Sequence, residues 1–279
     1  MEFSSVARRF FKHPTAIFGL VLLVILVVSA ILAPVIAPYD PDYQNLLLIN
    51  KNPSAEHLLG TDSLGRDTLS RILYGARVSL SISFIGVMIG TVLGVIIGLI
   101  AGYYGGAVDY AIEYIITILL AYPGLLLALI IIAIFGSSNT NTMIAIAVFV
   151  VPSMARTVRG LTMTLCEQEY VQACQVAGGS DLRIIFLQIL PNCMSQIIVN
   201  VTLNFGGAIL TVSGLSYLGV GVQPPTAEWG MMIAAARESL RTFPMGIIIP
   251  GIAVTLAVMA FSLVGDGLRD ALDPKLKNL

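Results

Sequence analysis

Long apolar stretches without any Asp, Glu, Lys or Arg dominate the chain. Five such stretches separate Lys12 from Asp40, Arg77 from Asp109, Glu113 from Arg156, Arg183 from Glu228 and Arg241 from Asp266. A helix needs about 20 mostly apolar residues to cross a bilayer, at a rise of about 1.5 Å per residue. Buried helices of soluble proteins do not need that length. The pattern therefore predicts an all-α polytopic membrane protein.

Turn-forming residues divide the longer stretches into individual spans. The polar sequence at 136–141 splits the third stretch into two helices. The fourth contains Pro191 and Pro224-Pro225 and predicts one span followed by an outer segment. Six transmembrane helices result, with seven as the alternative. The predicted helices are Ala16–Ala37, Val78–Tyr103, Ile112–Phe135, Thr142–Met154 and onward, Cys193–Ser216 and Phe243–Gly265. Pro123 and Pro250 fall inside two of them, where proline is expected to kink a helix.

The basic residues near the N-terminus suggest how the spans are oriented. Arg8, Arg9 and Lys12 precede an apolar stretch that is longer than the 7–15 residues of a secretory signal, so we expect an uncleaved first span. Six spans with a cytoplasmic N-terminus place more Lys and Arg inside than outside, in the direction of the positive-inside rule. The expected organisation is a cytoplasmic N-terminus at 1–15, a first transmembrane helix at 16–38, an extracytoplasmic segment at 39–76, a main transmembrane domain at 77–266 and a cytoplasmic tail at 267–279.

The composition agrees with a membrane protein and excludes several other classes. Charged residues make up 11% of the 279 residues, against roughly 25% in soluble domains. A net charge of −1 provides no basic surface for a nucleic acid. None of the lysines follows a glycine, so the chain has no ATP-binding P-loop. The interiors of the predicted spans contain no Asp, Glu, His or Lys of the kind that ion-coupled carriers use. We therefore expect a conduit that another protein drives, with no catalytic, metal or cofactor-binding residue of its own.

Two stripes of residues spaced four apart occur inside the predicted spans. Glycines repeat through the second span on one helix face, where another helix can approach closely. They are Gly86, Gly90, Gly94, Gly98 and Gly102. This face could slide during transport or serve packing alone. Amides repeat through the fifth span at Gln196, Asn200 and Asn204. They could line a hydrated pore or form hydrogen bonds between helices, because amides are costly in hydrocarbon.

The outer segment ends in alternating acids and bases. Asp62–Arg66 and Asp67–Arg71 have the i,i+4 spacing of helical ion pairs. Asp62 follows the turn at Gly60 and could cap a short helix. The segment therefore predicts a helix that lies on the membrane surface, with a direct partner contact as the alternative.

The long inner loop predicts a short helix between two caps. Residues Glu167–Ala177 have helical character, and Tyr170, Ala173 or Cys174, and Ala177 share one face. Gly178-Gly179 is typical of a helix C-cap, and Ser180 of an N-cap, with Asp181 in the first turn that follows. A small-residue helix fixed at both ends suits docking against a protein groove.

This loop resembles the EAA motif of binding-protein-dependent ABC importer permeases. Gln172-Ala173-Cys174, Gly178 and Leu190-Pro191 occupy the places of Glu-Ala-Ala, Gly and Leu-Pro, with Gln in place of Glu and Cys in place of the second Ala. Further motifs are similar to the second ("C") permease subunit of the dipeptide/oligopeptide/nickel importer group. They are Leu59–Asp67, Tyr74–Leu80, Gly219–Gly230 and Gly265–Pro274.

The resemblance implies a type I ABC permease fold over 77–266, with a cytoplasmic coupling helix. It also implies a prokaryotic plasma (inner) membrane protein with both termini cytoplasmic, which pairs with a homologous permease to form the pore. Two cytoplasmic ATPases, which carry ATP and Mg, and an extracytoplasmic solute-binding protein complete the system, and lipid surrounds it. The coupling residues would be Glu169, Tyr170, Gln172, Ala173, Cys174, Gly178 and Asp181. The expected cargo is di- or oligopeptides, with nickel or a metal chelate as the alternative and a self-powered channel or carrier as a more remote one.

Overall fold

A computed structural model of the chain describes residues 3–272, so Met1, Glu2 and the end of the expected tail at 273–279 lie outside the described residues. Within this range the chain forms helices and loops, with one isolated β-bridge between Thr61 and Asp67. The α-helices are α1 (Phe3–Phe10), α2 (Pro14–Ile36), α3 (Thr68–Tyr104), α4 (Gly106–Leu120), α5 (Gly124–Phe135), α6 (Asn139–Cys166), α7 (Glu169–Val176), α8 (Asp181–Ile184), α9 (Leu190–Tyr217), α10 (Trp229–Ala236) and α11 (Met245–Leu272). Three short helices, Leu46–Leu48, Ile185–Ile189 and Arg237–Ser239, complete the described set.

The predicted spans are found, but one of them is broken. Five helical segments in the described range are long and apolar enough to cross a bilayer: α2, α3, α6, the continuous segment from α8 through α9, and α11. The sixth candidate consists of α4 and α5, which meet at an angle of 93°. The prediction of a single helix at Ile112–Phe135 is therefore wrong. Pro123 occupies the N-cap of α5, and proline both lacks an N–H donor and disfavours helix in the residue before it.

Several helices begin before the residues at which they were predicted to begin. α3 begins ten residues before Val78, because Asp67 caps it by accepting a hydrogen bond from the Ser70 amide at 2.8 Å. α6 begins at Asn139, where the Ser138 hydroxyl accepts from the Asn141 amide at 3.0 Å. A five-residue π-helix at Ile185–Ile189 leads directly into α9. Polar side-chain caps set the starts of α3 and α6, whereas the prediction used the positions of charges and turn-forming residues.

The glycine stripe of α3 lies against α6 along most of the length of both helices. A Cβ atom added at Gly90 would lie 2.7 Å from the carbonyl oxygen of Ala147, and one at Gly98 would lie 2.6 Å from that of Ala155. Contacts this short leave room only for hydrogen at the glycine Cα. The two backbones therefore approach as closely as small-residue helix pairs in membranes do, and Val150 and Met154 of α6 are fully buried beside them.

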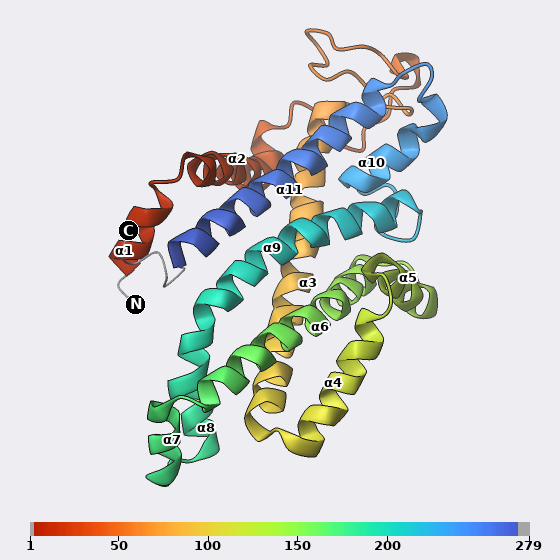
Figure 1. The fold of residues 1–279 in the computed structure, drawn as a ribbon. Helices are drawn as coiled ribbons and strands as arrows, with labels where there is room; N and C mark the ends of the chain where they lie inside the picture. Colours follow the sequence, from red (N-terminus) through yellow and green to blue (C-terminus); the bar gives the residue numbers. More distant parts are fainter. Residues whose placement is uncertain (1–2, 273–279) are drawn as a thin grey trace.

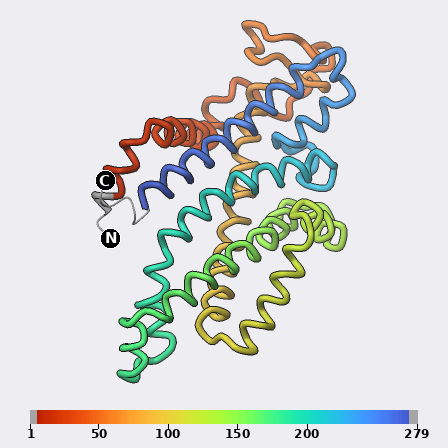
Figure 2. Tube along the Cα trace, viewed as in Figure 1, coloured from red at the N-terminus to blue at the C-terminus, as the bar shows by residue number. Residues whose placement is uncertain are grey.

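Loops and helix ends gather at two opposite sides of the bundle (Figures 1 and 2). α1 lies next to the C-terminal end of α11, where Phe10, Ala16 and Val264 form a small core cluster. α7 lies at the same side of the bundle as these ends, at the bottom left of Figure 1. The loop at 37–67 and the short helix α10 lie at the opposite side. The short helix α7 and the two described ends of the chain therefore lie on one side of the bundle.

Candidate coupling helix and polar helix faces

The short helix α7 confirms the helix predicted at Glu167–Ala177, with slightly narrower bounds. It lies between α6 and α8 and projects beyond the ends of the spans (Figure 1). Val171 is fully buried and anchors α7 in the cluster that also contains Val158 and Ile184. Sequence reasoning missed Val171, although it is the only β-branched apolar residue in the first turn of this helix.

The end of α7 confirms the predicted glycine cap. Gly178 adopts φ +76°, a conformation that is costly for residues with a Cβ atom. Its amide donates to the carbonyl oxygen of Gln175 at 3.0 Å, and the Gly179 amide donates to that of Cys174 at 3.0 Å. These two bonds form a Schellman motif. Ser180 occupies the predicted N-cap position of α8, and its side chain makes no capping hydrogen bond.

The outward surface of α7 is small and partly apolar. Tyr170, Ala173 and Ala177 are exposed along one side, and Val176 is 90% exposed beside them. Glu169 and Gln172 are exposed as well, while Cys174 is half-buried and turned toward the core. A hollow of about 340 Å³ lies beside the helix end. Its lining includes Ala177, Gly178, Arg183 and Gln188.

Two side-chain hydrogen bonds connect the α7–α8 segment to long helices of the bundle. The Tyr103 hydroxyl, in the last turn of α3, donates to Asp181 Oδ1 at 2.9 Å. The Asn192 amide, in the first turn of α9, donates to the Tyr170 hydroxyl at 3.3 Å. A displacement of the α7–α8 segment would therefore act on the ends of α3 and α9. Tyr103 was not among the predicted site residues.

The amide stripe of α9 lies at the surface beside α6. Gln196 is exposed, and Asn200 and Asn204 are half-buried. The Asn200 amide donates to the backbone carbonyl of Gln196 at 2.9 Å, so it bonds within its own helix rather than to a neighbour. A Cβ atom at Gly207, one turn further, would lie 3.8 Å from the Phe149 ring of α6.

An ionic cluster between α4 and α6 was missed by the sequence analysis. Arg159 binds both carboxylate oxygens of Asp109, with Nη2 2.7 Å from Oδ2. Arg156 Nη2 lies 2.7 Å from Glu113 Oε1. Because α4 belongs to the bent candidate span, the expectation that the spans contain no carboxylates is wrong at Asp109 and Glu113. These residues mark the ends of charge-free stretches, and the partners of Asp109 and Glu113 lie 50 and 43 residues away, respectively.

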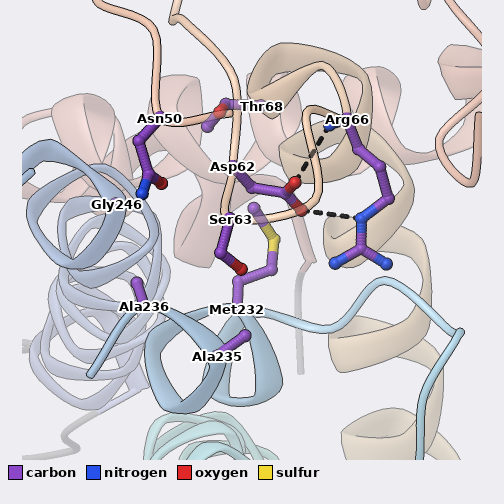
Figure 3. Close-up of a pocket in the computed structure, with 9 residues that line it drawn as sticks. All are labelled: Asn50, Asp62, Ser63, Arg66, Thr68, Met232, Ala235, Ala236 and Gly246. Carbon is purple, nitrogen blue, oxygen red and sulfur yellow. Dashed lines mark hydrogen bonds and ion pairs between the residues drawn. The ribbon is translucent and has the colours of Figure 1, made fainter. Parts of the chain in front are cut away.

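The acid–base pattern of the outer segment forms a loop rather than the predicted membrane-surface helix. Asp62 accepts from the backbone amides of Leu64 and Arg66 at 2.9 Å and from Arg66 Nε at 2.7 Å. Figure 3 shows this carboxylate holding Arg66, with Ser63 beside Met232 of α10. The predicted Asp62–Arg66 pair is present, in a loop instead of a helix.

The second predicted pair, Asp67–Arg71, is wrong. Asp67 caps α3 and lies 2.9 Å from His57 Nδ1. Arg71 turns away, donating to the Pro41 carbonyl at 2.8 Å and to Asp42 at 3.1 Å. The cap of α3 forms through short, local hydrogen bonds. It occupies the Asp67 carboxylate that a helical ion pair with Arg71 would need.

Glu228 and Trp229 form a buried junction between α10 and α3. Both side chains are 0% exposed. Glu228 accepts from the Met231 amide and from the Ser79 hydroxyl, each at 2.9 Å, and thereby caps α10. Burial raises the pKa of the Glu228 carboxyl, and the hydrogen bonds that it accepts oppose this shift. Trp229 Nε1 donates to the Ile72 carbonyl at 3.1 Å.

Comparison with solved structures shows which fold the chain has. The chain is similar to a structure titled "Inward facing conformations of the MetNI methionine ABC transporter", with a TM-score of 0.60, 14% identity and coverage of 73% of this chain and 96% of that one. An amino acid ABC transporter crystallised with histidines gives a TM-score of 0.56 at 16% identity, over 72% of this chain and 94% of that one. The fold is therefore that of an ABC importer permease, all-helical and polytopic.

The chain belongs to the family of binding-protein-dependent transport system inner membrane components, whose model matches residues 94–278. A model for the N-terminal transmembrane domain of oligopeptide transport permease C matches residues 3–53. Among relatives, the di/tripeptide transport system permease protein DppC of Pseudomonas aeruginosa is 45% identical over 97% of this chain and 91% of that protein. The glutathione transport system permease protein GsiD of Escherichia coli is 44% identical over 97% and 89%. The chain is thus a multi-span inner-membrane transport component.

Proposed function

We propose that this chain forms half of the translocation pore of an ATP-driven importer for di- and oligopeptides. The names of the two relatives support a peptide cargo, since one carries di- and tripeptides and glutathione is itself a tripeptide. The same names disfavour nickel or a metal chelate. A second, homologous permease would supply the other half of the pore, and an extracytoplasmic binding protein would deliver the peptide. Gln196, Asn200 and Asn204 are the proposed pore-lining residues.

The coupling element in this proposal is α7. The observation that carries it is the exposed Tyr170–Ala173–Ala177 face on a helix that is fixed by the Gly178 cap. We place this face against one of two cytoplasmic ATPases, which bind ATP and Mg, and we therefore place both termini in the cytoplasm. Closure of the ATPases would pull α7, and the hydrogen bonds at Tyr103 and Asn192 would pass the movement to α3 and α9.

The coupling proposal is tested by a charged side chain on the α7 face. The complex is purified through this chain and reconstituted in proteoliposomes with Ala173→Arg, and Ala173→Ser serves as a control of nearly equal size. We expect Ala173→Arg to insert and fold normally, to lose copurifying ATPase and to lose uptake, while Ala173→Ser keeps both. Gly178→Pro, which cannot adopt the positive φ, should behave like Ala173→Arg. Unchanged uptake in Ala173→Arg would remove α7 from the coupling role.

The cargo is tested on the binding protein rather than on this chain. The partner binding protein is purified with its native ligand, which is then released and analysed by mass spectrometry for peptides and by elemental analysis for nickel. Di- or oligopeptides are expected. A stoichiometric metal without peptide would overturn the cargo and leave the coupling proposal intact.

A further inference from the structure

An apolar cavity of about 580 Å³ lies between α2, α3, α9 and α11. Small-molecule sites usually occupy about 300–1,000 Å³. Three stacked rings line the cavity: the ring centroids of Phe84 and Phe205 lie 5.7 Å apart, and those of Phe205 and Phe261 lie 5.0 Å apart. Ile31 of α2 and Phe84 of α3, which both line the cavity, are 67% and 56% exposed. The cavity is therefore open to the surroundings of the chain.

The walls of this cavity offer few polar groups to a ligand. Its polar side chains are one arginine and two serines, Arg77, Ser81 and Ser83. The Ser81 hydroxyl donates to the Val78 carbonyl at 3.1 Å, and the Ser83 hydroxyl donates to the Ser79 carbonyl at 2.8 Å. Both hydroxyl protons are thus used within α3. The backbone amides of a peptide would find few partners here, and burying them unpaired is costly. The walls therefore favour a ligand with an apolar body over the transported peptide.

The arginine in the lining has no partner among the described residues. Arg77 is exposed, and no described group forms a hydrogen bond or an ion pair with its guanidinium. The two arginines that precede it have carboxylate partners, because Arg66 lies 2.7 Å from Asp62 and Arg71 lies 3.1 Å from Asp42. With every donor of its guanidinium available, Arg77 can bind two oxygens of one anionic group. A free cation beside an apolar cavity complements a ligand that carries a negative charge at one end.

The cation and the aromatic rings lie at different levels along α3. Arg77 is the last charged residue before the charge-free stretch that ends at Asp109, and basic side chains near the ends of apolar spans reach toward the lipid headgroups. Phe84 lies seven residues further along α3, which is about 10 Å at 1.5 Å per residue. The cavity therefore has its charge toward the loop at 37–67 and its rings deeper in the apolar stretch, in the order of the headgroup and the acyl chains of a phospholipid.

We propose that this cavity binds an anionic phospholipid, whose phosphate contacts Arg77 and whose acyl chain lies against the stacked rings. Basic pockets between transmembrane helices are known to hold anionic headgroups. Because α2 packs against α3 and α11, a lipid at this place fills the space between α2 and the aromatic rings and holds α2 against the bundle. The site does not depend on the peptide cargo, since the membrane itself supplies the ligand.

The charge at the site is tested by comparing Arg77→Gln with Arg241→Gln in the full complex, purified in neutral detergent. Arg241 is also exposed and without a described partner, but it does not line this cavity. Phosphatidylglycerol is the probe, phosphatidylcholine with the same acyl chains is the lipid without net charge, and native mass spectrometry counts the bound molecules. We expect the wild type and Arg241→Gln to hold one phosphatidylglycerol more than Arg77→Gln. Equal binding by all three proteins, or an equal loss in both variants, would overturn the site, as would a wild type that holds as much phosphatidylcholine as phosphatidylglycerol.

The apolar part of the site is tested by filling the cavity. Val27 lines it and is 38% exposed, so Val27→Trp adds bulk there and leaves Arg77 in place. This variant should lose the same phosphatidylglycerol molecule, and full binding would exclude an acyl chain from the cavity. A photo-crosslinking amino acid in place of Phe84 then identifies what covers the rings in the assembled complex. We expect a phospholipid adduct, whereas an adduct with the second permease would show that protein occupies the cavity and would refute the lipid site.

Discussion

The contact between α3 and α6 allows a quantitative prediction for a single methyl group. Gly98→Ala would place a Cβ atom 2.6 Å from the Ala155 carbonyl oxygen, 2.8 Å from Val158 Cβ and 3.0 Å from the Arg159 amide nitrogen. Two of these neighbours are backbone atoms, and the third is attached directly to the backbone. No side-chain rotation can relieve the overlap, so the two helices must separate.

The expected cost follows from similar overpacked sites. Adding a methyl group to a filled core costs about 1–3 kcal/mol when the surroundings must move. Each kcal/mol lowers the melting temperature of a domain of this size class by about 2–4 °C. We therefore expect Gly98→Ala to melt about 2–12 °C below the wild type in detergent, as measured by loss of the monodisperse peak in size-exclusion chromatography after heating.

Gly160→Ala provides the matched control, because Gly160 lies on α6 itself and its added Cβ would meet no atom within 4 Å. Alanine is the better helix former of the two, so this variant should melt at or slightly above the wild-type temperature. The close approach of α3 and α6 would be refuted if Gly98→Ala melted with the wild type. An equal loss in both variants would show that any added methyl group destabilises this protein.

Two further predictions concern single side chains at opposite sides of the bundle. Burial raises the pKa of the Glu228 carboxyl, so the folded chain binds the carboxyl proton more tightly than the unfolded chain does. The free energy of unfolding should therefore fall as the pH rises from the ordinary glutamate pKa of about 4.3 to the raised value. Glu228→Gln should make the melting temperature less dependent on pH across this range. If the variant keeps the wild-type pH dependence, another group causes it. Tyr103→Phe removes the hydrogen bond to Asp181, worth about 1 kcal/mol or a factor of roughly five in an equilibrium. It should lower the peptide imported per ATP hydrolysed without preventing assembly, whereas a parallel fall in uptake and ATP hydrolysis would contradict a coupling role.

The spans and the short helix were predictable because both depend on local sequence. A bilayer requires an apolar stretch of fixed length, and such stretches can be read directly from the chain. The Gly178 cap was predictable for a similar reason, since a helix end with positive φ favours glycine strongly. The glycines of α3 were recognised as a packing face, but their partner, α6, was not identified, because spacing along one helix carries no information about its neighbour.

Features that depend on distant residues could not be predicted in this way. Asp67 and Arg71 have ideal helical spacing, yet a helix cap takes the first and the loop near Asp42 takes the second. The bond between Glu228 and Ser79 joins residues 149 positions apart. Pro123 was expected to kink a span, but its sequence context did not show that the chain would turn by 93°. In each case the outcome depends on a partner or a bend angle that spacing along the chain does not specify.

The carboxylates of α4 also bear on how such a protein can be driven. A proton- or sodium-coupled carrier needs an acidic group that changes partner or protonation during each cycle. Asp109 is held by both donors of Arg159, and Glu113 lies between Arg156 and Arg159. Two acids and two arginines thus form a cluster without net charge in which each carboxylate lies beside an arginine. This cluster is therefore better suited to holding α4 against α6 than to binding a coupling ion. The energy for transport is then expected to enter through the α7–α8 segment, which side-chain hydrogen bonds connect to α3 and α9.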